Sequence, residues 1–195
     1  MEVKAGIKTT AARSTKEWRR WLDKNGEKEK SVWLIIYKKE SGVPSINYKQ
    51  AVEEALCFGW IDSKPNKRDE QSYYQFFAKR NPKSKWSKIN KEKVAQLIEE
   101  GRMTKTGLAA IEIAKQNGSW TSLDAIDNLV MPGDLQKALN KNKTALKNFN
   151  AFPISSKKII LGWIADAKRE DTRIKRISET VTQAQKNLRA NHYRQ

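Results

Sequence analysis

The chain has 195 residues, a formal net charge of +17, one cysteine and one histidine. This length fits one domain, or one domain with a small appendage, and can bury a core without disulfides, while no stretch reaches the ~18–20 consecutive apolar residues of a membrane span. Because Cys57 and His192 stand alone, the composition argues against disulfides, cysteine-rich zinc sites and histidine triads, and we expect neither a cofactor nor a metal.

The first third of the chain alternates between helix and strand patterns. Residues 1–13 have weak apolar content and are predicted to form a flexible arm. Ser14 and Glu17 form a capping-box pattern that predicts a short helix ending near Asn25. The continuous apolar run 32–37 contains β-branched and aromatic residues, which is typical of a strand buried on both faces.

A second helix and two more extended segments follow. Asn47 is a suitable N-cap for a helix that stops at Gly59. Extended segments are predicted at 60–62 and 73–77, with a polar turn over 64–71 between them. The order helix, strand, helix, strand, strand predicts an α+β fold, with a small sheet of about three strands packed against helices.

From residue 90 onward the pattern is helical. Asn90 and Thr104 are predicted to cap two antiparallel helices that end at Gly101 and Gly118. An α+β part over 14–118 is therefore expected.

A connecting segment over 119–132 leads to a helical part over 133–195. This part contains short helices at 134–139 and 144–149 and a longer helix capped by Ser155 or Ser156. The last helix starts near Asp171, and its apolar residues are spaced 3, 4, 3, 4, which suits packing on a helix of the same chain or of another subunit. An oligomer formed through this helix is one hypothesis. Whether the two parts are separate domains is left open by the sequence.

The excess of positive over negative charge is confined to three segments. Residues 64–93 carry a net charge of +7, and residues 133–158 and 168–195 carry +5 each. Such segments are typical of a polyanion-binding surface and equally of a solvated surface. The N-terminus lacks the apolar region of a secretory signal, so we expect a cytoplasmic protein.

Asp62 is a candidate chemical group because it directly follows an apolar run. A carboxylate there could be desolvated and catalytic, or it could mark the strand end or pair with a basic residue. Cys57 lies in the same run and has no histidine or second cysteine near it, which favours a buried, inert thiol.

The segment 76–88 interleaves basic residues with aromatic ones. Arg80 could bind a phosphate or a carboxylate, and Trp86 could stack on a base. The alternative is a loop in which Trp86 plugs the core and the lysines are solvated. Candidate nucleic-acid contacts are Lys79, Lys83, Lys85, Lys88, Arg173 and Arg176.

Several stretches together resemble the YdeI/OmpD-associated family, also called bacteriocin-protection proteins. They are VWLIIYKKESG (32–42), AVEEALCFGWIDS (51–63), KSKWSKINKEKVAQLIEEGRMTKTGLAAIEIAK (83–115), NGSW (117–120) and TRIKRI (172–177). The resemblance covers about residues 14–188. Where family members often show Thr-Pro-Arg, this chain has Ala78-Lys79-Arg80, which loses the proline but keeps the arginine. The resemblance implies protection against bacteriocin-like stress or association with an outer-membrane porin, and it implies no catalytic residues.

Three hypotheses follow from these observations. The leading one is a non-catalytic binding or stress-protection protein that contacts an unknown protein or a small anionic ligand through Lys38, Trp60, Asp62, Arg80, Trp86 and Ser87. The second is a nucleic-acid-binding protein that uses the three basic segments. The third is an enzyme on a small anionic substrate, with Asp62 as acid or base and Arg80 or Lys38 as anion clamp.

Overall fold

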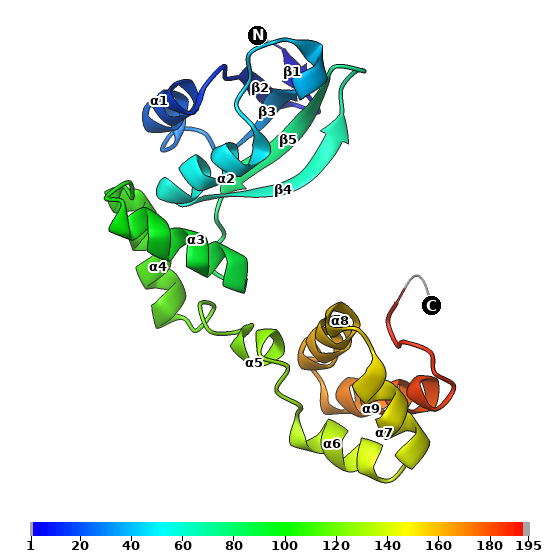
Figure 1. Cartoon of the computed structure of the whole chain (residues 1–195). Helices are drawn as coiled ribbons and strands as arrows, with labels where there is room; N and C mark the ends of the chain where they lie inside the picture. The colour runs from blue at the N-terminus through cyan, green and yellow to red at the C-terminus, as the bar shows by residue number, and fades with distance from the viewer. Residues whose placement is uncertain (1, 193–195) are drawn as a thin grey trace. The chain divides into compact units, whose positions relative to one another are not determined.

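The computed structural model describes residues 2–192 and has an α+β fold, which confirms the fold class predicted from the sequence (Figure 1). The chain divides into two compact units, one ending at Thr121 and the other beginning at Ser122. The first unit combines a sheet with four helices, and the second is helical. No helix among the described residues combines the length and apolar character needed to cross a membrane.

The first unit is built on a mixed five-stranded sheet. Its elements are β1 (Val3–Lys4), β2 (Ile7–Ala11), α1 (Thr15–Asn25), β3 (Ser31–Tyr37), the 3-10 helix η1 (Lys39–Ser41), α2 (Tyr48–Cys57), β4 (Trp60–Lys67), β5 (Ser72–Lys79), α3 (Lys88–Glu99) and α4 (Lys105–Gln116). The strand order is β1-β2-β3-β5-β4, with β2 parallel to β3 and the other neighbours antiparallel.

The sheet is larger than the sequence predicted. The flexible arm expected over 1–13 was wrong, because residues 3–11 contain β1 and β2. The polar turn expected over 64–71 was also too long, because β4 continues to Lys67. β1 and β4 form the two edges of the sheet, and β2 lies next to β1. All three strands are largely exposed, so they carry little of the apolar pattern that reveals a strand.

Local capping explains where the helices begin. The predicted cap Ser14 accepts a hydrogen bond from the Glu17 N–H, and Thr104 caps α4 in the same way through Gly107. Asn47 and Gln50 form a reciprocal capping box at α2. The cap predicted for α3, Asn90, was three residues late, because Ser87 caps this helix.

The strand β3 is buried on both faces, as predicted. Its even-numbered residues, such as Leu34, join a core with side chains from α1, α2, α3 and α4. The opposite face carries a separate cluster of strand residues, in which Trp33 and Tyr74 are buried. The Lys4 ammonium lies 5.5 Å from the Trp33 ring centre and 4.3 Å from the Tyr74 ring centre, so the N-terminal hairpin covers part of this face.

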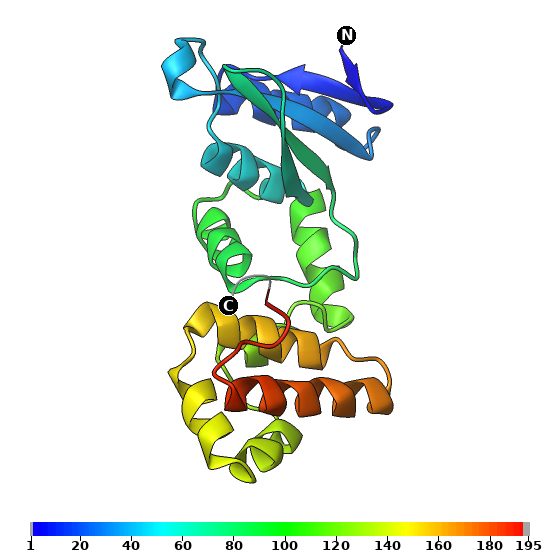
Figure 2. The same ribbon diagram turned by 90° about the vertical axis from the view of Figure 1, so that its right-hand side faces the viewer.

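The second unit contains the helices α5 (Asp124–Asp127), α6 (Gly133–Asn140), α7 (Lys143–Ala151), α8 (Ile154–Ala165) and α9 (Glu170–Gln185). Its core includes Leu135, Phe149, Ile160 and Ile164. Figure 2 shows α8 and α9 running antiparallel beside each other. The expected cap at Ser155 or Ser156 was wrong, since Pro153 precedes α8 and its ring presets the backbone angle at the helix start.

Candidate functional site

Arg80 has an unusual environment at the end of β5. Its backbone N–H donates to the carbonyl oxygen of Gly59 at 2.9 Å, and its Nη2 donates to the carbonyl oxygen of Lys85 at 2.7 Å. The guanidinium carbon lies 3.7 Å from the centre of the Trp86 ring. The Nε and Nη1 atoms are buried and have no hydrogen-bond partner among residues 2–192. Such unmet donors cost about 1–3 kcal/mol each when buried, and more on a charged group.

Arg80 remains positively charged despite the burial of its guanidinium nitrogens. Desolvation lowers the pKa of Arg80 to about 10, and the nearby charge of Asp62 opposes part of that decrease. The pKa stays well above neutral pH, so the side chain is a cation under ordinary conditions. The site therefore combines a positive charge with donors that the protein itself leaves unsatisfied.

A small cavity adjoins Arg80. Its volume is about 50 Å³, and it is lined by Arg80, Asn81, Pro82, Trp86, Ala110 and Ile113. A water molecule occupies about 30 Å³ in the liquid, so the space suits one or two waters, a small anion or a single carboxylate. A nucleotide does not fit in it.

The loop that carries this cavity is held in place by the end of α4. Asn117 Nδ2 and Ser119 Oγ both donate to the carbonyl oxygen of Pro82, at 2.8 and 3.1 Å. The Trp86 N–H donates to the Ser119 carbonyl oxygen at 3.3 Å, and the Trp86 ring lies 4.9 Å from the Trp120 ring. The cation and its aromatic support are thus fixed by hydrogen bonds and packing.

The hydrogen-bond partner of the Asp62 carboxylate is Tyr48 rather than Arg80. Its Oδ2 accepts a hydrogen bond from the Tyr48 hydroxyl at 2.6 Å. Burial and the Asp62 charge raise the pKa of Tyr48 to about 12. Asp62 acts on Arg80 through its charge, while its direct contact is with the start of α2.

The other sequence-predicted contact residues are distributed through the first unit. Trp60 and Trp86 are only 1% and 2% exposed and belong to the core. Ser87 caps α3 by accepting from the Asn90 N–H at 3.4 Å, which corrects the prediction that Asn90 is the cap. Lys38 donates to the Glu70 carbonyl oxygen near the other end of β5, and a strand of that length spans over ~20 Å.

The candidate nucleic-acid contacts lie in both units. Lys79 Nζ donates to the Glu27 carbonyl oxygen at 2.7 Å. Arg173 pairs with Asp134 at 2.6 Å, and Arg176 donates to the Trp163 carbonyl oxygen and lies 5.1 Å from its ring. Lys83 and Lys85 lie on the loop before α3, and Lys88 is the first residue of α3. Nucleic-acid binding stays a hypothesis.

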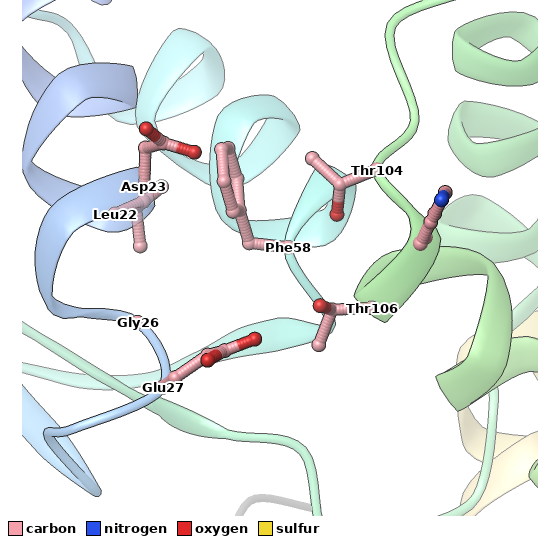
Figure 3. A pocket seen from close by; sticks show the side chains of 8 residues that line it. Leu22, Asp23, Gly26, Glu27, Phe58, Thr104 and Thr106 are labelled. Carbon is pink, nitrogen blue, oxygen red and sulfur yellow. The ribbon is translucent and has the colours of Figure 1, made fainter.

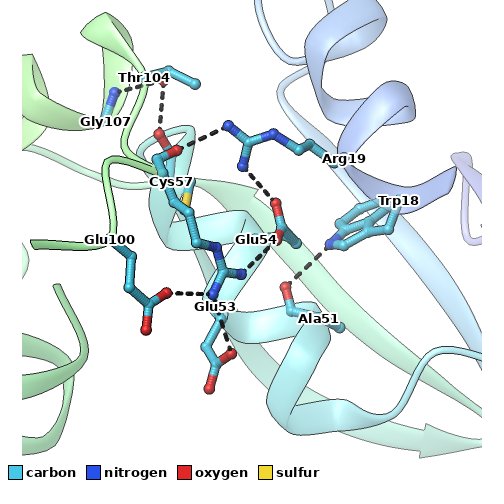
Figure 4. Close-up of polar contacts among 10 residues, drawn as sticks. Trp18, Arg19, Ala51, Glu53, Glu54, Cys57, Glu100, Thr104 and Gly107 are labelled. Atoms are coloured by element: carbon cyan, nitrogen blue, oxygen red, sulfur yellow. Dashed lines mark hydrogen bonds and ion pairs between the residues drawn. The ribbon is translucent and has the colours of Figure 1, made fainter. Parts of the chain in front are cut away.

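Sequence reasoning missed a buried ion network on α2. Glu54 is 3% exposed and accepts hydrogen bonds from Arg19 at 2.7 Å and from Arg102 at 2.6 Å (Figure 4). Arg19 also donates to the Arg102 carbonyl oxygen at 2.8 Å. One signal was present in the sequence: Glu54 falls among the apolar residues of the α2 core face, where a lone acid requires partners.

A pocket lies beside this network, between α1 and the start of α4. Its volume is about 170 Å³, and Figure 3 shows Asp23 and Glu27 on one side, Thr104 and Thr106 on the other, and Phe58 between them. An adjoining open groove of about 380 Å³ adds basic residues from α1. The lining thus mixes charges of both signs.

Cys57 precedes Phe58 of this pocket, and its thiol is not activated. Burial raises the pKa of the Cys57 thiol, so the neutral form dominates at neutral pH. Within the described part of the chain, no group of three or more histidine, cysteine or carboxylate side chains is placed to hold a metal ion.

Comparison with known proteins identifies two regions. No curated protein and no solved structure matches the chain. Residues 128–187 match the family described as bacteriocin-protection, YdeI or OmpD-associated, which confirms the predicted resemblance over a shorter range than 14–188. Residues 10–110, which contain most of the stretches behind that prediction, match a separate domain of unknown function. Since this second match spans just over half of the sequence, the chain belongs to the DUF8412 family, and it carries a YdeI/OmpD-associated region in its helical unit.

Proposed function

We propose that this protein is a non-catalytic, cytoplasmic binding protein that contributes to protection against bacteriocin-like stress by holding an anionic group at Arg80. The observation that carries the proposal is the pair of buried, unpartnered guanidinium nitrogens beside a cavity of about 50 Å³. Buried donors in proteins are nearly always satisfied, so these two mark a place where a ligand atom belongs.

The size and charge of the site define the class of ligand. A positive charge supported by an aromatic ring favours an anion, and arginine is well suited to carboxylate and phosphate oxygens. The small volume selects a single carboxylate or a small inorganic anion. The carboxylate could be the tip of an acidic side chain on a protein partner or a free organic acid, since both present the same oxygens.

The pKa values at the site support binding rather than acid–base catalysis. Tyr48 has a pKa of about 12 and Arg80 a pKa of about 10, so neither exchanges a proton readily near neutral pH. General acid–base catalysts work best with pKa values close to the working pH. The YdeI/OmpD-associated match in the helical unit supports the protective role through the family description.

An NMR titration tests anion binding directly. The Arg80 Nε–H and Trp86 Nε1–H signals are followed while acetate, and separately phosphate, is added at constant ionic strength. We expect saturable shifts of both signals in the wild type. In Arg80→Lys, where the Arg80 signal is absent, the shift of the Trp86 signal should be lost. The matched control is Arg169→Lys, because Arg169 is exposed and pairs with Asp171 in the other unit. Shifts that are linear in the wild type, or a Trp86 shift of equal size in Arg80→Lys, would reject the site.

The protective role needs a cellular measurement. Cells that rely on this chain are challenged with a bacteriocin, and survival is compared for the wild type, the double variant Asp62→Ala, Arg80→Ala, and Arg169→Lys. We expect the double variant to fold, as judged by circular dichroism, and to lose protection, while Arg169→Lys keeps it. Full protection by the folded double variant would contradict the proposal.

A further inference from the structure

The sheet face opposite the main core of the first unit carries a corner of three aromatic rings. Trp33 on β3 and Tyr74 on β5 have ring centres 6.0 Å apart, with an angle of 66° between the ring planes. Phe76 pairs in register with Trp33, and these two ring centres are 4.9 Å apart at 64°. Rings set at such angles form a corner rather than a stack, and their electron-rich faces attract cations.

An ammonium group of the chain itself lies against this aromatic corner. Lys4 Nζ is 4.3 Å from the centre of the Tyr74 ring and 5.5 Å from the centre of the Trp33 ring. Within the described part of the chain, this ammonium has neither a carboxylate partner nor a hydrogen-bond acceptor. The two rings are therefore its principal contacts, and the group that lies there shows which chemistry the corner accepts: an alkylammonium ion.

The strand that carries Lys4 is held to the sheet by few contacts. β1 has only two residues, and it pairs with β2 through Val3 and Lys4 alone. The turn that follows places Ala5 at a φ of 50° and Gly6 at a φ of 77°. The left-handed region suits glycine but strains alanine. A two-residue strand next to a strained turn opens readily, so a competing cation can displace Lys4 from the rings.

Glu2 provides the other attachment of this segment. Its carboxylate accepts a hydrogen bond from the Tyr74 hydroxyl and pairs with Arg68 at 3.2 Å. The Glu2 side chain is 41% exposed, so water weakens this ion pair and the pair adds little to the closed state. The negative charge of Glu2 also lies beside the Tyr74 ring, where it favours a cation over a neutral group.

The aromatic corner is better suited to a quaternary ammonium ion than to a lysine. The Lys4 ammonium has three N–H donors, and aromatic rings accept hydrogen bonds only weakly. A quaternary ammonium ion has no N–H group that needs an acceptor, and its methyl groups pack on ring faces. The Nε1 atom of Trp33 is buried and has no hydrogen-bond partner among the described residues, so the same indole offers a donor to an oxygen of a ligand.

We propose that the corner formed by Trp33, Tyr74 and Phe76 binds a small quaternary ammonium compound of the choline or betaine class, and that Lys4 competes with it. The rings attract the cation, and the Trp33 N–H donates to the hydroxyl or carboxylate oxygen. The affinity measured for the wild type is reduced because the site is open only while Lys4 is displaced. This site differs from the Arg80 site in its residues and in the sign of the charge that it binds.

A titration of the full-length chain with choline chloride tests the competition with Lys4. The Trp33 Nε1–H signal, assigned with Trp33→Phe, is followed by NMR at constant ionic strength. We expect a saturable shift, and a dissociation constant at least about tenfold lower in Lys4→Gln than in the wild type. Lys8→Gln is the matched control, because Lys8 lies on the same hairpin, points to the other face and pairs with Glu29. Its dissociation constant should stay within about twofold of the wild type.

A second pair of variants tests the ring itself in the Lys4→Gln background. Tyr74→Phe keeps the ring and should change the dissociation constant by less than about threefold, whereas Tyr74→Leu should raise it at least about tenfold. Circular dichroism checks the fold; if Tyr74→Leu does not fold, the comparison of Lys4→Gln with Lys8→Gln decides. The proposal is overturned if Lys4→Gln shows no saturable shift or binds no tighter than the wild type. Equal binding of ammonium chloride, or binding that persists in folded Tyr74→Leu, also overturns it.

Discussion

The guanidinium carbon of Arg80 lies 3.7 Å from the centre of the Trp86 ring, so a cation rests on a tryptophan that is itself part of the core. The contact contributes about 0.5–2 kcal/mol when the cation is desolvated, which offsets some of the cost of burying the charge. The rest of the free-energy cost of burial comes from the Nε and Nη1 atoms of Arg80, which have no hydrogen-bond partner among the described residues. An arginine in such a place is what the proposed anion-binding role requires.

Arg80→Met tests whether this arginine serves binding or stability. Methionine keeps the aliphatic volume and removes the unmet donors, while the cation–π contact and the bond to the Lys85 carbonyl are lost. These effects oppose each other, so the free energy of unfolding should stay within about 1 kcal/mol of wild type while anion binding disappears. Urea denaturation gives the first value. A loss above about 3 kcal/mol would assign Arg80 to the fold.

Glu54→Gln is expected to destabilise the first unit by about 3 kcal/mol. The neutral amide removes the buried charge that the partly exposed guanidinium groups of Arg19 and Arg102 share, and the amide is left in the buried position of Glu54. Its control is Glu53→Gln, because Glu53 lies 4.0 Å from Arg102, at the limit of an ion pair, and should cost under about 1 kcal/mol. Equal losses in both variants, measured by urea denaturation, would contradict a special role for Glu54.

Gly107→Ala should weaken the packing of α4 on α2. A Cβ at this position would lie 2.2 Å from the Cys57 carbonyl oxygen and 2.9 Å from Met103 Cε, so the helix would have to move. Overpacking of this kind costs about 1–3 kcal/mol. Gly133→Ala, where nothing lies within 4 Å of the added atom, should instead be neutral or stabilise by up to about 1 kcal/mol. The thermal unfolding temperature should therefore fall for Gly107→Ala and stay unchanged or rise for Gly133→Ala.

The Tyr48–Asp62 hydrogen bond predicts an alkaline pH dependence. Burial and the hydrogen bond to Asp62 raise the pKa of Tyr48 to about 12 in the folded protein, whereas the ordinary pKa of a tyrosine is 10.0. The stabilisation from this group is therefore complete below pH 10 and is lost as the pH rises through 12. Asp62→Asn removes the charge and should lower the Tyr48 pKa toward 10.0. Ultraviolet titration of tyrosinate checks this, with Tyr48→Phe identifying the signal; an unchanged curve in Asp62→Asn would rule out the coupling.

Local signals in the sequence were sufficient for much of the fold. Ser14, Asn47 and Thr104 were recognised as caps because capping depends on residues three positions apart. The strand β2 was missed because it is short and pairs in parallel with β3, about 24 residues further on. Nothing in the sequence of the first thirteen residues encodes that distant partner.

The candidate site could be predicted only in part. Arg80 and Trp86 were singled out together because they lie six residues apart in a basic, aromatic loop. The sequence could not distinguish a tryptophan that meets a ligand from one that fills the core, and Trp60 proved to be of the second kind. Glu54 was missed because its partners Arg19 and Arg102 come from segments 35 and 48 residues away.

The small β1–β2 hairpin covers one edge of the sheet and part of its aromatic face. Its first strand, β1, pairs with the outer edge of β2, and Lys4 of β1 lies over the rings of Trp33 and Tyr74. A chain shortened to begin at Ile7 would leave an open strand edge next to an uncovered aromatic face, which is the combination that promotes strand addition between molecules. Fusion partners for this protein are therefore better placed on the helical unit than at the start of the chain.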